Sequence, residues 1–190
     1  MRARLAVVTL VSAWFCGCAG WPVAAPCPPV LPPQPVTGWS GSMAGAEIIE
    51  LTRADGTRHQ MLVVSDRSPR RLMLRGFNLI GLELFRLEYT DGQPDVEWLG
   101  DATPGLDARV LVSDYQFVHW PASSLAARLD GKRWRLDQGD ARRTLYCRDQ
   151  RVTELHHEPD GVVRLFNVQL DYRLEIRPVS AAVDARHDAH

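Results

Sequence analysis

Residues 103–129 read TPGLDARVLVSDYQFVHWPASSLAARL and form the one long segment of the chain whose pattern predicts helix. Thr103 is a suitable N-cap, and Pro104 suits the first helical position, where a missing N–H costs no hydrogen bond. Apolar side chains then recur at helical spacing and predict a single buried stripe, formed by Leu106, Val110, Leu111, Phe117 and Val118.

The dipeptide Trp120-Pro121 should end this helix, because a residue before proline is pushed out of the α region. A second short helix is expected at residues 122–129, with Gly131 just beyond its end. Strand-and-turn sequence lies on both sides of the helical pair. We therefore predict an α+β fold in which a curved antiparallel β-sheet wraps over the helices and covers their apolar face.

The flanking segments alternate between short apolar runs and turn signals. Asp55-Gly56, Asp91-Gly92 and Asp160-Gly161 are typical of hairpin turns. The strands expected before the helices span residues 46–53, 57–65, 70–76, 82–90 and 94–99. Those expected after the helices span residues 132–138, 141–148 and 151–157.

Residues 164–177 show the clearest alternation in the chain. The even positions are apolar, and this predicts one long strand whose core-facing side chains are Phe166, Val168, Leu170, Tyr172, Leu174 and Ile176. The run exceeds the usual length of about five or six residues, so we expect a strong bend or a bulge that leaves the faces unchanged. A long bent strand with one apolar face indicates a half-barrel with an interior.

The N-terminus resembles an export signal. An apolar run at residues 5–15 follows two arginines and is too short to span a bilayer. The run leads to Gly17-Cys18, and a small residue directly before cysteine is the pattern of a bacterial lipoprotein signal. We predict a signal peptide at residues 1–17 and a lipidated Cys18, with a plain secretory signal as the alternative. Ala19, rather than aspartate, follows the anchor and favours the periplasmic face of the outer membrane.

The segment after this cysteine is rich in proline. Residues 19–37 contain seven of the thirteen prolines. We expect a stiff tether at residues 18–37, a folded domain at 38–179 and a disordered tail at 180–190. Cys27 and Cys147 would either pair in an oxidising periplasm or remain free thiols, and the sequence favours neither alternative.

Three blocks of sequence resemble a known family: NLIGLELFRLEYTDG at residues 78–92, VLVSDYQFVHWPASSLAARL at 110–129 and FNVQLDYRLEIRPV at 166–179. They are similar to an uncharacterised bacterial lipoprotein family often encoded beside aryl-polyene and related fatty-acid-synthase-like gene clusters. That family is grouped with the fold of LolA and LolB, the carrier and the outer-membrane receptor for lipoproteins. The resemblance implies an open half-barrel of the eleven-stranded type, with helices over a concave face that holds acyl chains.

The interior of such a half-barrel is the candidate ligand cavity. Its expected lining is Val110, Asp114, Phe117, Val118, Trp120, Phe166, Leu170 and Leu174. Asp114 lies in the middle of the apolar stripe, where an unpaired carboxylate would be costly. We expect a structural role for it, either pairing with backbone or an arginine such as Arg143, or capping a restart of the helix. The alternative is contact with a ligand headgroup.

Phe77, Leu79 and Ile80 lie between two expected strands and beside two glycines. Residues of this kind usually continue the strands into the core, and that is the expectation here. The alternative is an apolar loop tip that contacts a membrane, by analogy with the protruding loop of LolB.

Other classes of function find little support in the sequence. A formal net charge of −1 does not indicate nucleic-acid binding. Adjacent His156 and His157 would point to opposite faces of a strand, so we expect no metal site, and no cofactor motif is present. Without a nucleophile–base motif we also expect no enzymatic activity.

We expect a monomeric outer-membrane lipoprotein that binds a lipid or acylated product, such as an aryl-polyene-type lipid or a lipoprotein, and inserts it or hands it over. Its expected partners are the acyl chain, the membrane and a periplasmic carrier protein. The alternative is a structural or interaction lipoprotein with a filled core that binds a protein partner. An acyl hydrolase or transferase is the third hypothesis.

Overall fold

A single antiparallel β-sheet dominates the computed structural model, which describes residues 26–38, 42–90, 92–99, 107–131 and 133–179. The strands are β1 (Met43–Arg53), β2 (Arg58–Ser68), β3 (Arg71–Phe77), β4 (Glu83–Tyr89), β5 (Asp95–Trp98), β6 (Trp134–Gln138), β7 (Arg142–Cys147), β8 (Gln150–His157), β9 (Val163–Asn167) and β10 (Tyr172–Pro178). Their order is β5-β4-β3-β2-β1-β10-β9-β8-β7-β6, so the first and last strands pair at the centre. Within the described residues the sheet has ten strands, not the eleven implied by the resemblance, and it is not closed.

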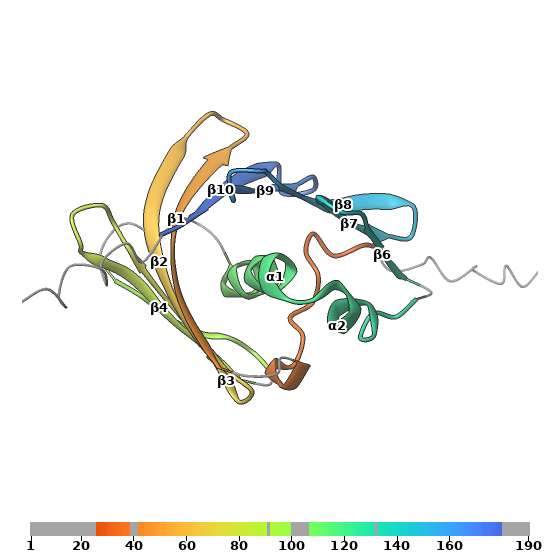
Figure 1. Cartoon of the computed structure of the whole chain (residues 1–190), viewed down its shortest axis with the longest axis horizontal. Helices are drawn as coiled ribbons and strands as arrows, with labels where there is room; N and C mark the ends of the chain where they lie inside the picture. The colour runs from red at the N-terminus through yellow and green to blue at the C-terminus, as the bar shows by residue number, and fades with distance from the viewer. Residues whose placement is uncertain (1–25, 39–41, 91, 100–106, 132, 180–190) are drawn as a thin grey trace, which may run out of the picture.

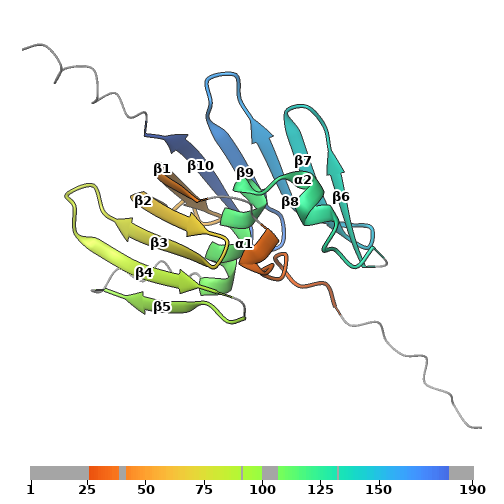
Figure 2. The same ribbon diagram turned by 60° about the horizontal axis from the view of Figure 1, so that its bottom comes forward.

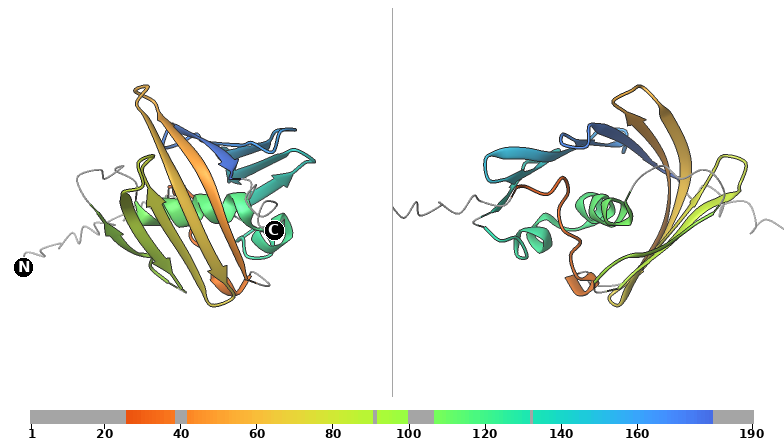
Figure 3. Two further views of the ribbon diagram at one scale, coloured as in Figure 1. Left: turned by 60° about the vertical axis from the view of Figure 1, so that its left-hand side comes forward. Right: turned by 180° about the vertical axis from the view of Figure 1, so that it is seen from behind.

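The sheet curves into an arch over the longer helix, α1 (Ala108–His119), as Figure 1 and the two views of Figure 3 show. Strands β1–β5 form one half of the arch and β6–β10 form the other, with α1 between the two halves in Figure 2. The short α2 (Ala122–Ala126) lies beside β6. The expected curved antiparallel sheet over helices is therefore present. Neither helix in the described part of the chain has the length and apolar character to cross a membrane.

Helix α1 begins later than the sequence predicted. Asp107 is its N-cap, and the side chain accepts a hydrogen bond from the Arg109 backbone N–H at 2.8 Å. The predicted cap, Thr103, and the proline after it lie outside the described residues. The helix ends as expected at Trp120, whose extended backbone precedes Pro121. Helix α2 ends at Ala126 instead of at residue 129.

Helix α1 is buried around most of its circumference rather than along one stripe. Residues 112–118 are all buried, including Gln116, whose side chain is 0% exposed. A helix that is covered on every side needs partners for its polar side chains as well as for its apolar ones. The concave sheet covers one side, and the N-terminal segment of the chain covers another.

That segment, residues 26–38, is not a free tether; we call it the strap. It crosses the open side of the arch and ends in a short 3₁₀ turn, η1 (Val36–Gly38), as Figure 1 shows. A disulfide joins Cys27 to Cys147, which decides between the two alternatives left by the sequence. Leu31 is 1% exposed and packs in the core, so the folded domain begins earlier than residue 38.

Two-way hydrogen bonds fix the strap along its length. The Gln116 side chain accepts from the Gln34 N–H at 2.7 Å and donates to the Gln34 carbonyl at 2.6 Å. The Asn167 amide donates to the Pro29 carbonyl at 2.9 Å. These contacts satisfy backbone groups that a run of prolines leaves without β-sheet partners.

Residues 164–177 form two strands rather than the single bent strand predicted. Strands β9 and β10 are a hairpin in which Asn167 pairs with Tyr172. Asp171 adopts a left-handed backbone with φ of 48°, and the Asn167 side chain accepts hydrogen bonds from two backbone N–H groups of the turn. The hairpin reverses the predicted faces of β9, because Leu165 and Asn167 point inward and Phe166 does not.

The Asp55-Gly56 and Asp160-Gly161 turns occur as predicted. Gly56 and Gly161 both have φ above 80°, which suits glycine. The signal peptide, Cys18, Asp91 and the tail at residues 180–190 lie outside the described residues.

Candidate functional site

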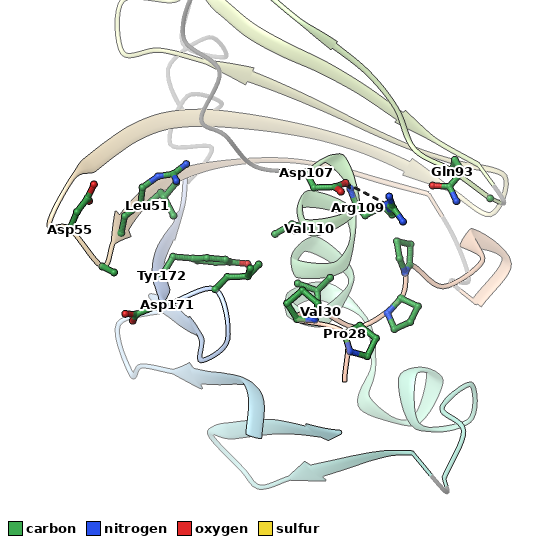
Figure 4. Close-up of a pocket in the computed structure, with 17 residues that line it drawn as sticks. Pro28, Val30, Leu51, Asp55, Gln93, Asp107, Arg109, Val110, Asp171 and Tyr172 are labelled. Atoms are coloured by element: carbon green, nitrogen blue, oxygen red, sulfur yellow. Dashed lines mark hydrogen bonds and ion pairs between the residues drawn. The ribbon is translucent and has the colours of Figure 1, made fainter. Parts of the chain in front are cut away.

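An open pocket of about 950 Å³ lies at one end of the arch, where the strap and the start of α1 meet three turns of the sheet (Figure 4). We call it the mouth pocket. Its lining comprises Pro28, Pro29, Val30, Pro32, Pro33, Leu51, Arg53, Ala54, Asp55, Gly92, Gln93, Asp107, Arg109, Val110, Leu170, Asp171 and Tyr172. The volume lies at the upper end of the range of about 300–1,000 Å³ that is usual for small-molecule sites.

The mouth pocket has an apolar floor. Leu51, Val110 and Tyr172 are each less than 10% exposed and belong to the central core. The prolines of the strap form one wall, and Val30 is buried behind them. A floor of this kind favours contact with hydrocarbon.

The rim of the mouth pocket is polar, and charges of opposite sign are close together there. Arg109 lies 3.6 Å from the Asp107 carboxylate, the pair joined by a dashed line in Figure 4. On the opposite rim, Asp55 accepts a hydrogen bond from the Thr57 N–H at 2.9 Å. That hydrogen bond, and the charge of Arg53 to a lesser degree, lower the pKa of Asp55. The rim therefore offers both positive and negative groups to a polar headgroup.

A second, narrow space lies between α1 and the concave face of β1–β4 and β10; we call it the inner gap. Its volume is about 60 Å³. The helix contributes side chains at positions i, i+3, i+4, i+7 and i+8, namely Leu111, Asp114, Tyr115, Val118 and His119. The sheet contributes mostly aliphatic side chains, such as Ile49, Val63 and Leu174. The interior is therefore neither a continuous wide cavity nor completely filled.

Asp114 lies in the inner gap and bonds to a group of the mouth pocket. It accepts a hydrogen bond from the Tyr172 hydroxyl, and both side chains are buried. Burial raises the pKa of Asp114 to about 7, against an ordinary value of 3.8, and the hydrogen bond from Tyr172 offsets part of this rise. Burial beside this carboxyl also raises the pKa of Tyr172. The partner of Asp114 is therefore a tyrosine, not backbone or an arginine as expected, and α1 runs unbroken through this residue, so Asp114 caps no restart of the helix.

Arg143 is not the partner of Asp114. Its guanidinium donates to the Trp120 carbonyl at 2.9 Å and to the Phe117 carbonyl, and its Nε donates to Gln138 at 2.8 Å. Arg143 thus binds the carbonyls at the C-terminal end of α1, which the helix itself leaves unsatisfied. Its charge also suits the negative end of the helix dipole.

The eight residues predicted to line one cavity are divided among several environments. Val110 and Leu170 line the mouth pocket, and Asp114, Val118 and Leu174 line the inner gap. Phe117 and Trp120 are buried in the core on the side of the strap and β6–β9 and line neither space. The prediction was wrong for Phe166, whose ring lies under the Arg173 guanidinium at 5.3 Å on the outer face. Leu170 lies in a turn and is 42% exposed, so it is not a core residue.

The β3–β4 turn exposes aliphatic side chains, contrary to the expectation that they continue the strands into the core. Leu79 is 65% exposed and Ile80 is 82% exposed, and Leu82 follows at 61%. The Asn78 side chain shapes the turn by accepting hydrogen bonds from the Ile80 and Leu82 N–H groups. Phe77 is half-buried in β3, with the Arg75 guanidinium 5.2 Å from its ring. We call Leu79, Ile80 and Leu82 the aliphatic tip.

Histidines on both faces of the sheet have ordinary structural partners. His119 lies 3.2 Å from Glu47, and its ring packs on Tyr115 with centroids 4.3 Å apart. His156 bonds to Glu154 at 2.6 Å on the outer face. In the part of the chain that the structure describes, no group of three or more His, Cys, Asp and Glu side chains is placed to hold a metal ion.

Sequence reasoning missed the strap prolines and Leu51. A partial signal for Leu51 was present, because Ile49 and Leu51 are apolar at alternate positions of β1, although Ile48 on the other face obscures the pattern. No comparable signal exists for the strap, since proline-rich sequence has no periodicity that specifies what it packs against.

Comparisons with known proteins add a family assignment. The model of a family described as "Protein of unknown function (DUF3261)" matches residues 48–180, from within β1 to just past β10. This match covers most of the chain and leaves the strap outside it. A search of curated proteins finds no match.

Proposed function

The chain belongs to the family described as "Protein of unknown function (DUF3261)", and on this premise we propose that it is an outer-membrane lipoprotein that binds a lipid or acylated molecule in the mouth pocket. We further propose that it inserts this molecule or hands it over, as LolA and LolB do for lipoproteins, and that it acts as a carrier rather than as an enzyme. An aryl-polyene-type lipid is the proposed cargo class, received from a periplasmic carrier protein.

One observation carries the proposal: an open pocket of about 950 Å³ has an apolar floor and a polar rim, and its floor residue Leu51 also lines the apolar inner gap. Polar headgroups and hydrocarbon tails need this division of surfaces. A methylene group gains about 0.8 kcal/mol on burial, so a chain of a few carbons on such a floor supplies a useful binding energy.

The outer face of the sheet favours carriage over the interaction-module hypothesis. Cross-strand ion pairs cover it, among them Arg75–Glu83 at 2.6 Å, Arg142–Glu154 at 3.0 Å and Arg164–Glu175 at 3.4 Å. The arginines of these pairs are 42–57% exposed and remain solvated, and surface ion pairs of this kind contribute little energy. Exposed aliphatic side chains instead gather at the aliphatic tip, which we propose contacts the membrane during transfer.

The disulfide limits how far the pocket can lie from a lipid anchor at Cys18. Cys27 is fixed to β7, and nine residue steps separate it from Cys18. At about 3.3–3.6 Å per extended residue, the chain reaches roughly 30 Å. A protein anchored in this way keeps its mouth pocket close to the bilayer.

Replacing Cys18 by serine should release the protein from the membrane fraction. An unmodified mature N-terminus at another residue, found by mass spectrometry, would refute lipidation.

The binding proposal is tested on the soluble Cys18→Ser protein. Native mass spectrometry should detect co-purified lipid, and a fluorescent fatty acid should titrate to saturation after lipid is removed. Val110→Trp fills the floor of the mouth pocket and should abolish the titration. Val64→Trp is the matched control, because Val64 is 36% exposed on β2 and lines neither space. A protein without co-purified lipid and without saturable titration would instead favour the interaction module.

A further inference from the structure

Three side chains form the wall between the mouth pocket and the inner gap. Leu51 on β1 lines both spaces. Tyr172 on β10 lines the mouth pocket, Asp114 on α1 lines the inner gap, and the hydrogen bond between them crosses the boundary. The wall therefore joins the helix to the two central strands of the sheet.

The contact that closes this wall between the helix and the sheet is made by side chains. The hydrogen bond between Asp114 and Tyr172 lies across the boundary, and Leu51 is paired in register with Leu174 behind it. Rotation of the tyrosine and leucine side chains alters such a wall without breaking the β1–β10 ladder. Backbone would have to move if a strand or turn formed the boundary.

The space behind the wall suits hydrocarbon. The inner gap runs along the face of α1 from Leu111 to His119, and aliphatic side chains from four strands face it. At about 60 Å³ it has room for a few atoms beyond those present, since one water needs about 10–15 Å³. Only the end of a chain fits without displacement of α1.

We propose that the ligand is a single-chain amphiphile whose headgroup stays at the rim of the mouth pocket, while the end of its tail passes Leu51, separates Tyr172 from Asp114 and enters the inner gap. This inference rests on the proposed function and adds a route and a selection for chain length. Short tails lie wholly in the mouth pocket. Longer tails gain contacts in the inner gap only after the Asp114–Tyr172 hydrogen bond breaks.

The test compares saturated fatty acids of eight, twelve and sixteen carbons, each displacing a fluorescent fatty acid from the soluble Cys18→Ser protein. Each buried methylene raises affinity about fourfold, so affinity should climb with length and then climb less steeply where the wall must open. Tyr172→Phe keeps the ring but removes the hydrogen bond. It should raise the ratio of the affinity for the longest acid to the affinity for the shortest acid about fivefold.

Val118→Phe supplies the opposite perturbation, because it fills the inner gap from the helix. This substitution should abolish the extra affinity that the longest acid gains from the inner gap, and it should not change the affinity for the shortest acid. Tyr146→Phe is the matched control for Tyr172→Phe, since Tyr146 stacks under Arg135 at 4.1 Å on β7 and lines neither space. If Val118→Phe does not fold, the comparison of Tyr172→Phe with wild type still shows whether long tails enter the inner gap.

The outcomes separate the two proposals. Saturable binding with the same chain-length profile in wild type, Tyr172→Phe and the control would show that tails stay in the mouth pocket, which overturns this inference and leaves the proposed function intact. A profile altered equally by Tyr146→Phe would also overturn it. If the wild-type protein binds none of the acids, both the proposed function and the proposed route of the tail are refuted.

Discussion

Asp114 should make the stability of the protein fall as pH rises, and Asp114→Asn should abolish this component. Burial raises the pKa of the carboxyl from 3.8 to about 7. Between these values the folded protein keeps a proton that the unfolded chain releases. The free energy of unfolding then decreases by about 1.4 kcal/mol for each pH unit, or roughly 4 kcal/mol in all. Asparagine is neutral throughout, and its side-chain carbonyl accepts the Tyr172 hydroxyl.

The measurement is urea denaturation of both proteins from about pH 4 to about pH 8, followed by tryptophan fluorescence. Other groups titrate in this range with opposite sign; hydrogen bonding lowers the pKa of Glu83, and burial lowers that of His157. Subtracting wild type from Asp114→Asn cancels these contributions. The difference should increase in favour of the variant by roughly 4 kcal/mol across the range. A difference that stays constant with pH would show that the Asp114 carboxylate is solvated or paired with a cation, and would refute the environment described for it.

Two further predictions concern packing. Gly76→Ala should destabilise the protein by about 1–3 kcal/mol in urea denaturation, because its Cβ would lie 2.1 Å from the Phe85 ring, whereas Gly131→Ala, with nothing within 4 Å, should be nearly neutral. Equal effects would mean that the ring moves aside freely. Leu174→Ala should cost about 2–5 kcal/mol and Leu170→Ala less than about 1 kcal/mol, because the first is 8% exposed and the second 42%. The reverse ranking would contradict the β9–β10 hairpin.

Much of the fold is predictable because its signals are local. The Asp55-Gly56 turn and the Trp120-Pro121 break each depend on residues within four positions. The alternation at residues 164–177 led to a wrong prediction of which side chains face the core. Asn167, a polar residue, points inward to support a turn, while Phe166 points outward beneath an arginine. Period-two reasoning assigns each of these two residues to the wrong face.

The candidate site was less predictable because its contacts are distant in sequence. Asp114 was identified as a polar residue in an apolar stripe, but its partner Tyr172 lies 58 positions away. The strap bonds to Gln116 and Asn167 across 82 and 138 positions. Neither a helical nor a strand period encodes such pairs, so the position of the pocket wall follows only from the assembled fold.

The central pairing of β1 with β10 has a consequence for how the chain folds. All the other neighbouring strands are consecutive in sequence and join through short turns, so each half of the sheet can assemble from local hairpins. The β1–β10 ladder, from Glu47↔Pro178 to Arg53↔Tyr172, needs both ends of the domain. Until the last strand has emerged from the ribosome, β1 is an open edge with aliphatic Ile48 and Ile49 and no partner on that side. A nascent chain of this protein is thus most vulnerable to misassembly until β10 has been synthesised, and a deletion of β10 would remove the centre of the sheet and not its margin.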